Sequence, residues 1–235
     1  VGESEAWNSE ISLCLAALAT GWIDASADIL CRVLADPLTN LDLEHGWWSS
    51  ALESLAKDCP KRACDAVRTI LDRFTERWAQ SNQDDADSVL PAPRDKLHRL
   101  PTAHDFGEAL GVLARTVPAE FLTTVLPWTL RAMQSSCRSY HGRSFADNWQ
   151  YWSTEDLHRD NPSGKLLMAI GQAAKVLAKI APSVLRGFAP QLLASQCLPM
   201  QVAVAEAYEE NPAEFAPDAA EFLASDPRRL RLDSG

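Results

Sequence analysis

The sequence is poor in the residues from which nucleotide, metal and disulfide sites are usually built. Its 235 residues include only 10 glycines, and none stands in the G-x-x-x-x-G-K-[ST] spacing whose backbone amides wrap the phosphates of a nucleotide. The five histidines include no pair at i, i+4, the spacing that places two imidazoles on one helical face for zinc. The six cysteines form no C-x-x-C pair. We therefore expect no P-loop, no metal site and no disulfide framework.

Three short motifs resemble a catalytic, a metal-binding and a haem-binding motif, and each has a simpler structural explanation. Segment 142–146 reads Gly-Arg-Ser-Phe-Ala and lacks the second glycine of the G-x-S-x-G turn that exposes a nucleophilic serine. The acidic cluster at 84–87 lies in a polar stretch rather than on an apolar helical frame, which favours a solvated loop over a metal-binding helix. Cys59-Pro60 resembles a haem-regulatory dipeptide, but its proline belongs to a repeat. The sequence therefore predicts no enzyme and no cofactor.

Long apolar runs are also missing. The most apolar stretch, 166–184, is interrupted by Gln172, Lys175, Lys179 and Pro182, whereas a membrane helix needs about 18 or more largely uncharged apolar residues. We therefore predict no membrane segment. No basic-then-apolar signal peptide opens the chain, and unpaired cysteines among apolar residues are typical of a reducing compartment. These features favour a cytoplasmic location.

Basic residues are outnumbered by acidic ones. Lys and Arg number 22 against 32 Asp and Glu, which gives a formal net charge of −10. Because binding to nucleic-acid phosphates needs a net basic face, this balance argues against nucleic acid as the main partner. The chain also begins at Val1 rather than at an initiator methionine, from which we expect a fragment of a larger multidomain protein.

What the sequence does contain is a repeat. Segments 51–60, 109–118 and 173–182 share an alanine at the first position, then Leu-Ala followed by a basic residue, and a proline at the last position. Internal similarity of this kind is the signature of stacked helical repeats. A weaker copy ends at Pro212, where the Leu-Ala-basic triplet is replaced by Ala-Tyr-Glu.

Apolar residues around each repeated proline predict one helix on either side of it. Before the proline they stand at offsets of 12, 8 and 5, and after it at 3, 7 and 10 or 11, which is helical spacing. Proline is tolerated in the first turn of a helix and disfavours helical geometry in the residue before it. The residues are Trp48, Leu52, Leu55, Ala63, Val67, Ile70 and Leu71; Phe106, Leu110, Leu113, Phe121, Val125 and Trp128; and Ile170, Ala174, Leu177, Leu185, Ala189, Leu192 and Leu193.

We therefore predict an all-α fold, a right-handed stack of about five antiparallel helix pairs forming one α-solenoid segment over 1–235. The first pair is joined at Thr20-Gly21 and closed by Asp36-Pro37. Two insertions, at 80–103 and 134–163, lengthen the spacing between repeats. The pairs are expected at about 5–35, 43–79, 104–133, 164–196 and 199–224.

Two resemblances follow from these motifs. The paired helices of about 30 residues per unit resemble HEAT or armadillo α-solenoids, which implies a curved stack used as a scaffold. The repeated Leu-Ala-basic-x-x-Pro helix ends, Leu126-Pro127-Trp128 and Asp147-Asn148-Trp149 resemble the helical repeat regions of large bacterial STAND-type NTPases, including anti-phage defence sensors. That resemblance implies partner recognition, with ATP bound by another domain.

The second insertion is the predicted partner-binding region. Trp, Tyr and Arg dominate interface hot spots because they bury a large area while keeping a polar group, and insertions in solenoids often map to a binding face. The alternative is that these aromatic residues cover the gap between adjacent repeats, since buried aromatics commonly serve packing. The candidate residues are Arg138, His141, Arg143, Trp149, Tyr151 and Trp152.

Three functions remain open on the sequence alone. The preferred hypothesis is a non-catalytic recognition module that binds another protein or another domain of its own parent chain. The second is a purely structural spacer between a sensor and an effector or NTPase domain. The third is a HEAT-like enzyme acting on nucleic acid, which the acidic balance disfavours.

Overall fold

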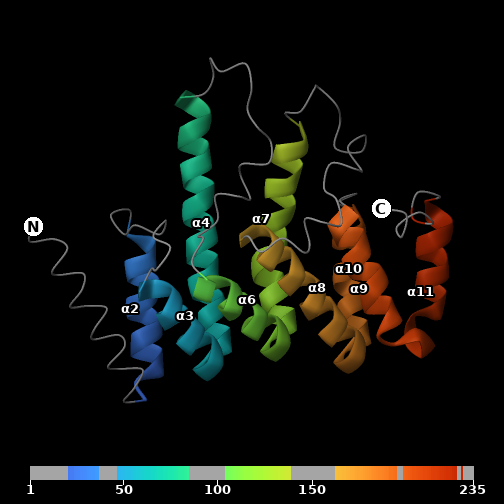
Figure 1. The fold of residues 1–235 in the computed structure, drawn as a ribbon, viewed down its shortest axis with the longest axis horizontal. Coiled ribbons are helices and arrows are strands. Elements are labelled where there is room, and N and C mark those ends of the chain that lie inside the picture. Colours follow the sequence, from blue (N-terminus) through green and yellow to red (C-terminus); the bar gives the residue numbers. More distant parts are fainter. Residues whose placement is uncertain are drawn as a thin grey trace, which may run out of the picture.

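The computed structural model describes residues 21–36, 47–84, 104–138, 162–194, 198–226 and 229, and every secondary-structure element within these ranges is helical (Figure 1). Its side chains are described for 21–36, 48–74, 106–132, 164–194, 199–226 and 229. The prediction of an all-α, solenoid-like stack is confirmed. No helix in the described ranges is both long and apolar enough to cross a membrane.

The described helices follow the repeat read from the sequence. Helix α2 (Ile23–Ala35) precedes four pairs, and each repeated proline is the first residue of the second helix of its pair. The partner of α2 in the first predicted pair lies outside the described residues. The pairs are α3 (Trp47–Asp58) with α4 (Pro60–Asp84), α6 (His104–Thr116) with α7 (Pro118–Arg138), α8 (Pro162–Ile180) with α9 (Pro182–Ala194), and α10 (Leu198–Glu209) with α11 (Pro212–Ser225).

In three of these pairs a single residue joins the two helices. The N–H of the linking residue donates to the carbonyl four residues back, at 2.7 Å for Cys59, 2.9 Å for Val117 and 2.8 Å for Ala181. The carbonyl of the same residue then accepts the N–H four residues ahead, for example from Phe121 to Val117 at 2.9 Å. The missing N–H of the proline is needed by neither helix, so the chain changes direction within one residue.

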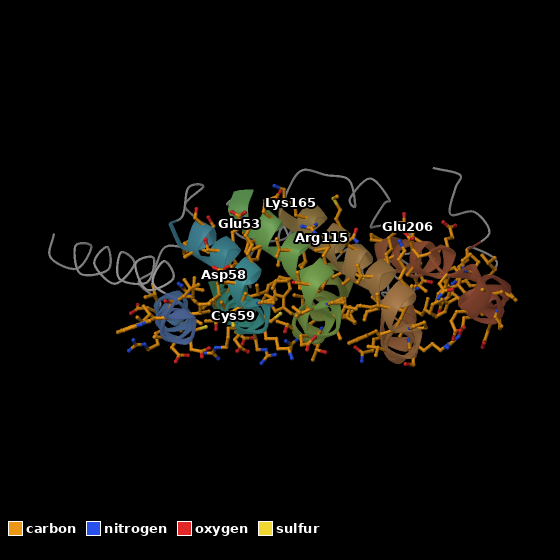
Figure 2. The ribbon with its side chains drawn as sticks, turned by 90° about the horizontal axis from the view of Figure 1, so that it is seen from below. Glu53, Asp58, Cys59, Arg115, Lys165 and Glu206 are labelled. Carbon is orange, nitrogen blue, oxygen red and sulfur yellow. The ribbon has the colours of Figure 1, made fainter. Side chains whose placement is uncertain are left out.

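The helices form two layers. The first helices of the pairs pack side by side in the order α3, α6, α8 and α10, while α2, α4 and α7 pack side by side in the second layer. Figure 2 shows the first helices in the upper row and the second helices in the lower row. The one-residue turns lie along one edge of the stack, here called the turn edge, and the opposite edge is called the insertion edge. Stacking neighbouring pairs in this way buries one continuous core.

The core lies between the two layers and is built from the predicted positions. Trp48, Phe106 and Ile170, each twelve residues before a repeated proline, are fully or almost fully buried. The rings of Trp48 and Phe106 meet edge to face, with centroids 5.9 Å apart, and so join α3 to α6. One expected core residue departs from the pattern, because Leu193 is only partly buried.

Helices α4 and α7 are longer than their partners. They span 25 and 21 residues, against 12 for α3 and 13 for α6, and their carboxyl-terminal ends project beyond the stack at the insertion edge (Figure 1). The insertions were predicted to begin at 80 and 134, but the helices continue to Asp84 and Arg138. No glycine or proline follows either position closely enough to end the helix sooner.

The start of α2 follows the predicted break at Thr20-Gly21. Gly21 has a φ of +82°, in the left-handed region that side chains with a Cβ disfavour. The chain then enters α2, whose first turn is closed by Ser26, since its N–H and hydroxyl donate to the carbonyl of Trp22 at 3.1 and 2.9 Å. At the other end, Asp36 caps α2 through its N–H to the carbonyl of Val33.

Candidate interaction surface

The predicted partner-binding residues lie almost entirely outside the described part of the chain. Arg138 is the last residue of α7, and its side chain is not among those described. His141, Arg143, Trp149, Tyr151 and Trp152 fall between α7 and α8, also outside the described residues. The structure therefore fixes where their segment is attached, while their role stays a prediction.

The helix that leads into this segment is firmly anchored. One face of α7 is buried, from Phe121 through Val125 to Ala132, and Trp128 is 2% exposed. Pro127 stands on the opposite, exposed face, where the hydrogen bond that proline cannot make costs least because water solvates the free carbonyl. Helix α7 is thus anchored in the stack as far as Ala132, and its carboxyl-terminal end projects past the insertion edge (Figure 1).

The outer face of the first layer carries charges of both signs, and several of them form ion pairs. Glu53, Arg115, Lys165 and Glu206 spread along this face on successive helices (Figure 2). Lys57 pairs with Glu53 within α3 at 2.6 Å. Such exposed pairs contribute about 0–1 kcal/mol each, so they shape the surface charge more than the stability.

Two further pairs on this face join α8 to α10. The Nζ atoms of Lys175 and Lys179 lie 2.7 Å from carboxylate oxygens of Glu206 and Glu210. The hydrogen bond from Lys179 lowers the pKa of the Glu210 carboxyl below its ordinary value. The stacking of the last two helix pairs is therefore aligned by complementary charges.

The outer face of the second layer carries ion pairs between helices. Arg62 of α4 bonds Asp28 of α2, and also Asp65 on its own helix at 3.1 Å. Arg186 of α9 reaches two carboxylates of α11, Glu214 at 2.6 Å and Asp218 at 3.1 Å. Sequence analysis overlooked these pairs, although a signal exists: helices α8 and α9 contain basic residues and no Asp or Glu, while α10 and α11 contain Asp and Glu and no Lys or Arg.

The described cysteines are free thiols close to the core. Cys64 is buried, and Cys31 and Cys59 are partly buried, in agreement with the expectation of unpaired thiols among apolar residues. Burial raises the pKa of Cys64 to about 11, and the carboxylates of Glu120 and Asp65 act in the same direction. Burial also raises the pKa of Cys31. The reactive species of a cysteine is its thiolate, so neither thiol is poised as a nucleophile.

We expect alkylation of Cys64 by iodoacetamide at pH 8 to be at least about 100-fold slower in the folded protein than in the unfolded chain. A thiol whose pKa is raised from 9.0 to about 11 holds about 100-fold less thiolate at that pH. Peptide mass spectrometry resolves each cysteine, and the same protein in guanidinium chloride serves as the control. Equal rates in the two conditions would contradict the buried, protonated thiol.

No metal-binding chemistry is present in the part of the chain that the structure describes, where no three His, Cys, Asp or Glu side chains come together as ligands. Comparisons of the chain with protein-family models, with curated proteins and with solved structures found no match. The resemblance to helical repeat proteins therefore rests on the repeated sequence pattern and on the observed stack of helices.

Proposed function

We propose that this chain is a non-catalytic recognition module, in which the helical stack presents the 134–163 insertion to another protein or to another domain of its parent chain. The observation that carries the proposal is the attachment of this insertion. It follows α7, which packs along α4 and whose end projects at the insertion edge, and it precedes α8 in the chain (Figure 1). A helix anchored in the core as α7 is up to Ala132 lowers the entropy cost of ordering a binding segment attached to it.

Two further observations support a binding role rather than catalysis. Burial raises the pKa of the thiols of Cys31 and Cys64, and several charges on the outer faces are engaged in ion pairs between or within helices. The remaining feature with hot-spot composition is the insertion, with Trp149, Tyr151 and Trp152 near Arg143. We extend the proposal to a recognition region of a STAND-type NTPase in antiviral defence, acting in the cytoplasm.

The test compares three forms of the protein as bait in lysate of the source cells. They are the unmodified chain, the variant R143A/W149A/W152A, and the control W22A/R131A, which removes an exposed tryptophan and an exposed arginine from the stack itself. Quantitative mass spectrometry is expected to find a saturable partner that the control retains and the insertion variant loses by at least tenfold, while thermal melting is unchanged in all three. A partner retained by the insertion variant would contradict the proposal.

A structural spacer is the second candidate, and the alignment of successive pairs favours it. One-residue turns and ion pairs between helices, such as Lys175 with Glu206, suit a stack that holds other domains apart. Under this function the insertion variant would lose stability rather than a partner. A nucleic-acid enzyme is the third candidate. Phosphate binding is strongest at low salt, so a gel-shift assay at low salt in which the protein does not retard duplex DNA would rule this candidate out.

A further inference from the structure

The polar contacts between successive second-layer helices recur at equivalent positions. On α7, the second and sixth residues after Pro118 are Glu120 and Thr124. Glu120 lies 3.4 Å from Lys61 of α4, and Thr124 accepts a hydrogen bond at 3.5 Å from Arg68 of α4. The contacts from the preceding helix therefore fall on two adjacent turns of the same face.

The same two positions are used on α11. The second and sixth residues after Pro212 are Glu214 and Asp218, and both accept hydrogen bonds from Arg186 of α9. The guanidinium of Arg186 also lies 5.0 Å from the ring centroid of Phe215. Arg186 thus spans the space between two helices that do not pack along each other as α4 and α7 do.

Helix α9 breaks this pattern. The second and sixth residues after Pro182 are Val184, which is 38% exposed, and Phe188, which is partly buried. The donors of the neighbouring contacts stand one, four and eight residues after their own repeated proline, as Lys61, Arg186 and Arg68. The residues at the same distances after Pro118 on α7 are apolar: Ala119, Leu122 and Leu126. The seam between α7 and α9, meaning the facing sides of these two second-layer helices, therefore carries apolar residues at the positions where the neighbouring helices carry charged or polar ones.

The packing changes at the same place. Helix α4 packs along α7, but among the described residues neither α7 with α9 nor α9 with α11 packs in this way. Arg186 bridges α9 and α11, whereas no ion pair joins the described side chains of α7 to those of α9, and the two halves of the stack meet mainly where α8 packs against α6 and α7. In the first half Arg73, 7% exposed, donates to the carbonyl of Leu34 at 2.8 Å and ties α4 to α2. In the second half Asn211 donates to the carbonyl of Ala178 at 3.1 Å. Each half is thus cross-linked internally by directional bonds.

We propose that the junction between α7 and α9 is a hinge, at which the half formed by α2–α7 and the half formed by α8–α11 bend against each other. Ion pairs and hydrogen bonds fix the register of two helices, whereas apolar contacts are non-directional and permit small sliding motions. The first-layer contact between α6 and α8 acts as the pivot, and the second layer opens or closes. The bending changes one angle. Its two sides are the projecting ends of α4 and α7, in the first half, and the last two helix pairs, in the second half.

Pulsed electron paramagnetic resonance, which measures the distance between two spin labels, tests this motion on the full chain. The labels are carried by unnatural amino acids, because the six native cysteines would also react with a thiol-directed label. Labels at Asp72 and Glu221 span the junction, whereas Asp24 with Arg131 and Gln191 with Glu221 each stay within one half; all five sites are exposed. The expected result is a distance distribution at least twice as broad across the junction as within either half. Equal widths would overturn the hinge.

A pair of variants tests whether the seam itself is the moving part. A119R/V184E places at the seam the charges that Lys61 and Glu120 carry between α4 and α7, and A119E/V184E places two like charges there. At low ionic strength, the mean Asp72-to-Glu221 label distance is expected to differ between the two variants, with both within-half distances unchanged. An identical mean distance in the two variants would place the bending elsewhere and overturn the assignment to this seam.

Discussion

Replacing Trp48 with alanine is expected to lower the free energy of unfolding by about 3–5 kcal/mol, the usual cost of deleting a large buried aromatic side chain. Trp48 is 0% exposed and its ring meets that of Phe106 on the next first-layer helix. The substitution leaves a cavity between α3 and α6, where two repeats join. Chemical denaturation followed by circular dichroism measures the change, since every described element is helical.

The matched control for this prediction is Trp48→Phe. The Nε1 atom of Trp48 is buried and has no hydrogen-bond partner among the described residues, so phenylalanine leaves no described acceptor unsatisfied and keeps an aromatic ring against Phe106. We expect a loss of only about 1–2 kcal/mol, from the smaller volume. A phenylalanine variant as unstable as the alanine variant would show that the indole N–H is bonded after all.

Gly171 is the second position at which a large effect is expected, because α8 and α10 approach each other closely there. A Cβ atom added at Gly171 would lie 3.7 Å from the Cβ of Ala203, an ordinary contact with no room beyond it. Gly171→Leu therefore forces the two helices apart and is expected to cost about 1–3 kcal/mol. Gly171→Ala fits, and removing glycine from a helix interior is expected to raise the free energy of unfolding by about 0.5–1 kcal/mol.

The comparison within this pair makes the prediction specific. Gly187, near the middle of α9, has no described atom outside its own helix backbone within 4 Å of an added Cβ, so Gly187→Leu should cost little while Gly187→Ala gains a similar amount to Gly171→Ala. Thermal unfolding of the four variants under identical conditions checks the ranking. If leucine is equally tolerated at both glycines, α8 and α10 are not in close contact at Gly171.

The sequence predicted the local features of the fold because they depend on nearby residues. A proline fixes the start of a helix through its own geometry, so the bounds at Pro60, Pro118 and Pro182 could be located without tertiary information. Core positions such as Phe106 and Ile170 follow from helical spacing for the same reason. The end of α4 was placed too early, because polar composition was taken for a loop where no residue breaks the helix, and α7 also continues past the predicted bound at 133.

Contacts between distant residues were not predictable from a single sequence. Arg62 and Asp28 are 34 residues apart, and Arg186 and Glu214 are 28 apart, so pairing them requires knowing which helices are neighbours. The charge segregation between α8–α9 and α10–α11 hinted at such pairs without identifying partners. The six residues proposed for partner binding, Arg138, His141, Arg143, Trp149, Tyr151 and Trp152, stay a prediction, because their side chains lie outside the described residues.

The one-residue turns divide the chain into places that can change length and places that cannot. Adding or deleting a residue at Cys59, Val117 or Ala181 would rotate the following helix by about 100°, a consequence of 3.6 residues per turn, and would carry its core side chains toward solvent. Growth of the chain is therefore confined to the opposite edge, where segments of different length separate α4 from α6 and α7 from α8. New binding segments can be acquired on that edge without disturbing the repeat, and a fluorescent or affinity domain is best inserted there as well.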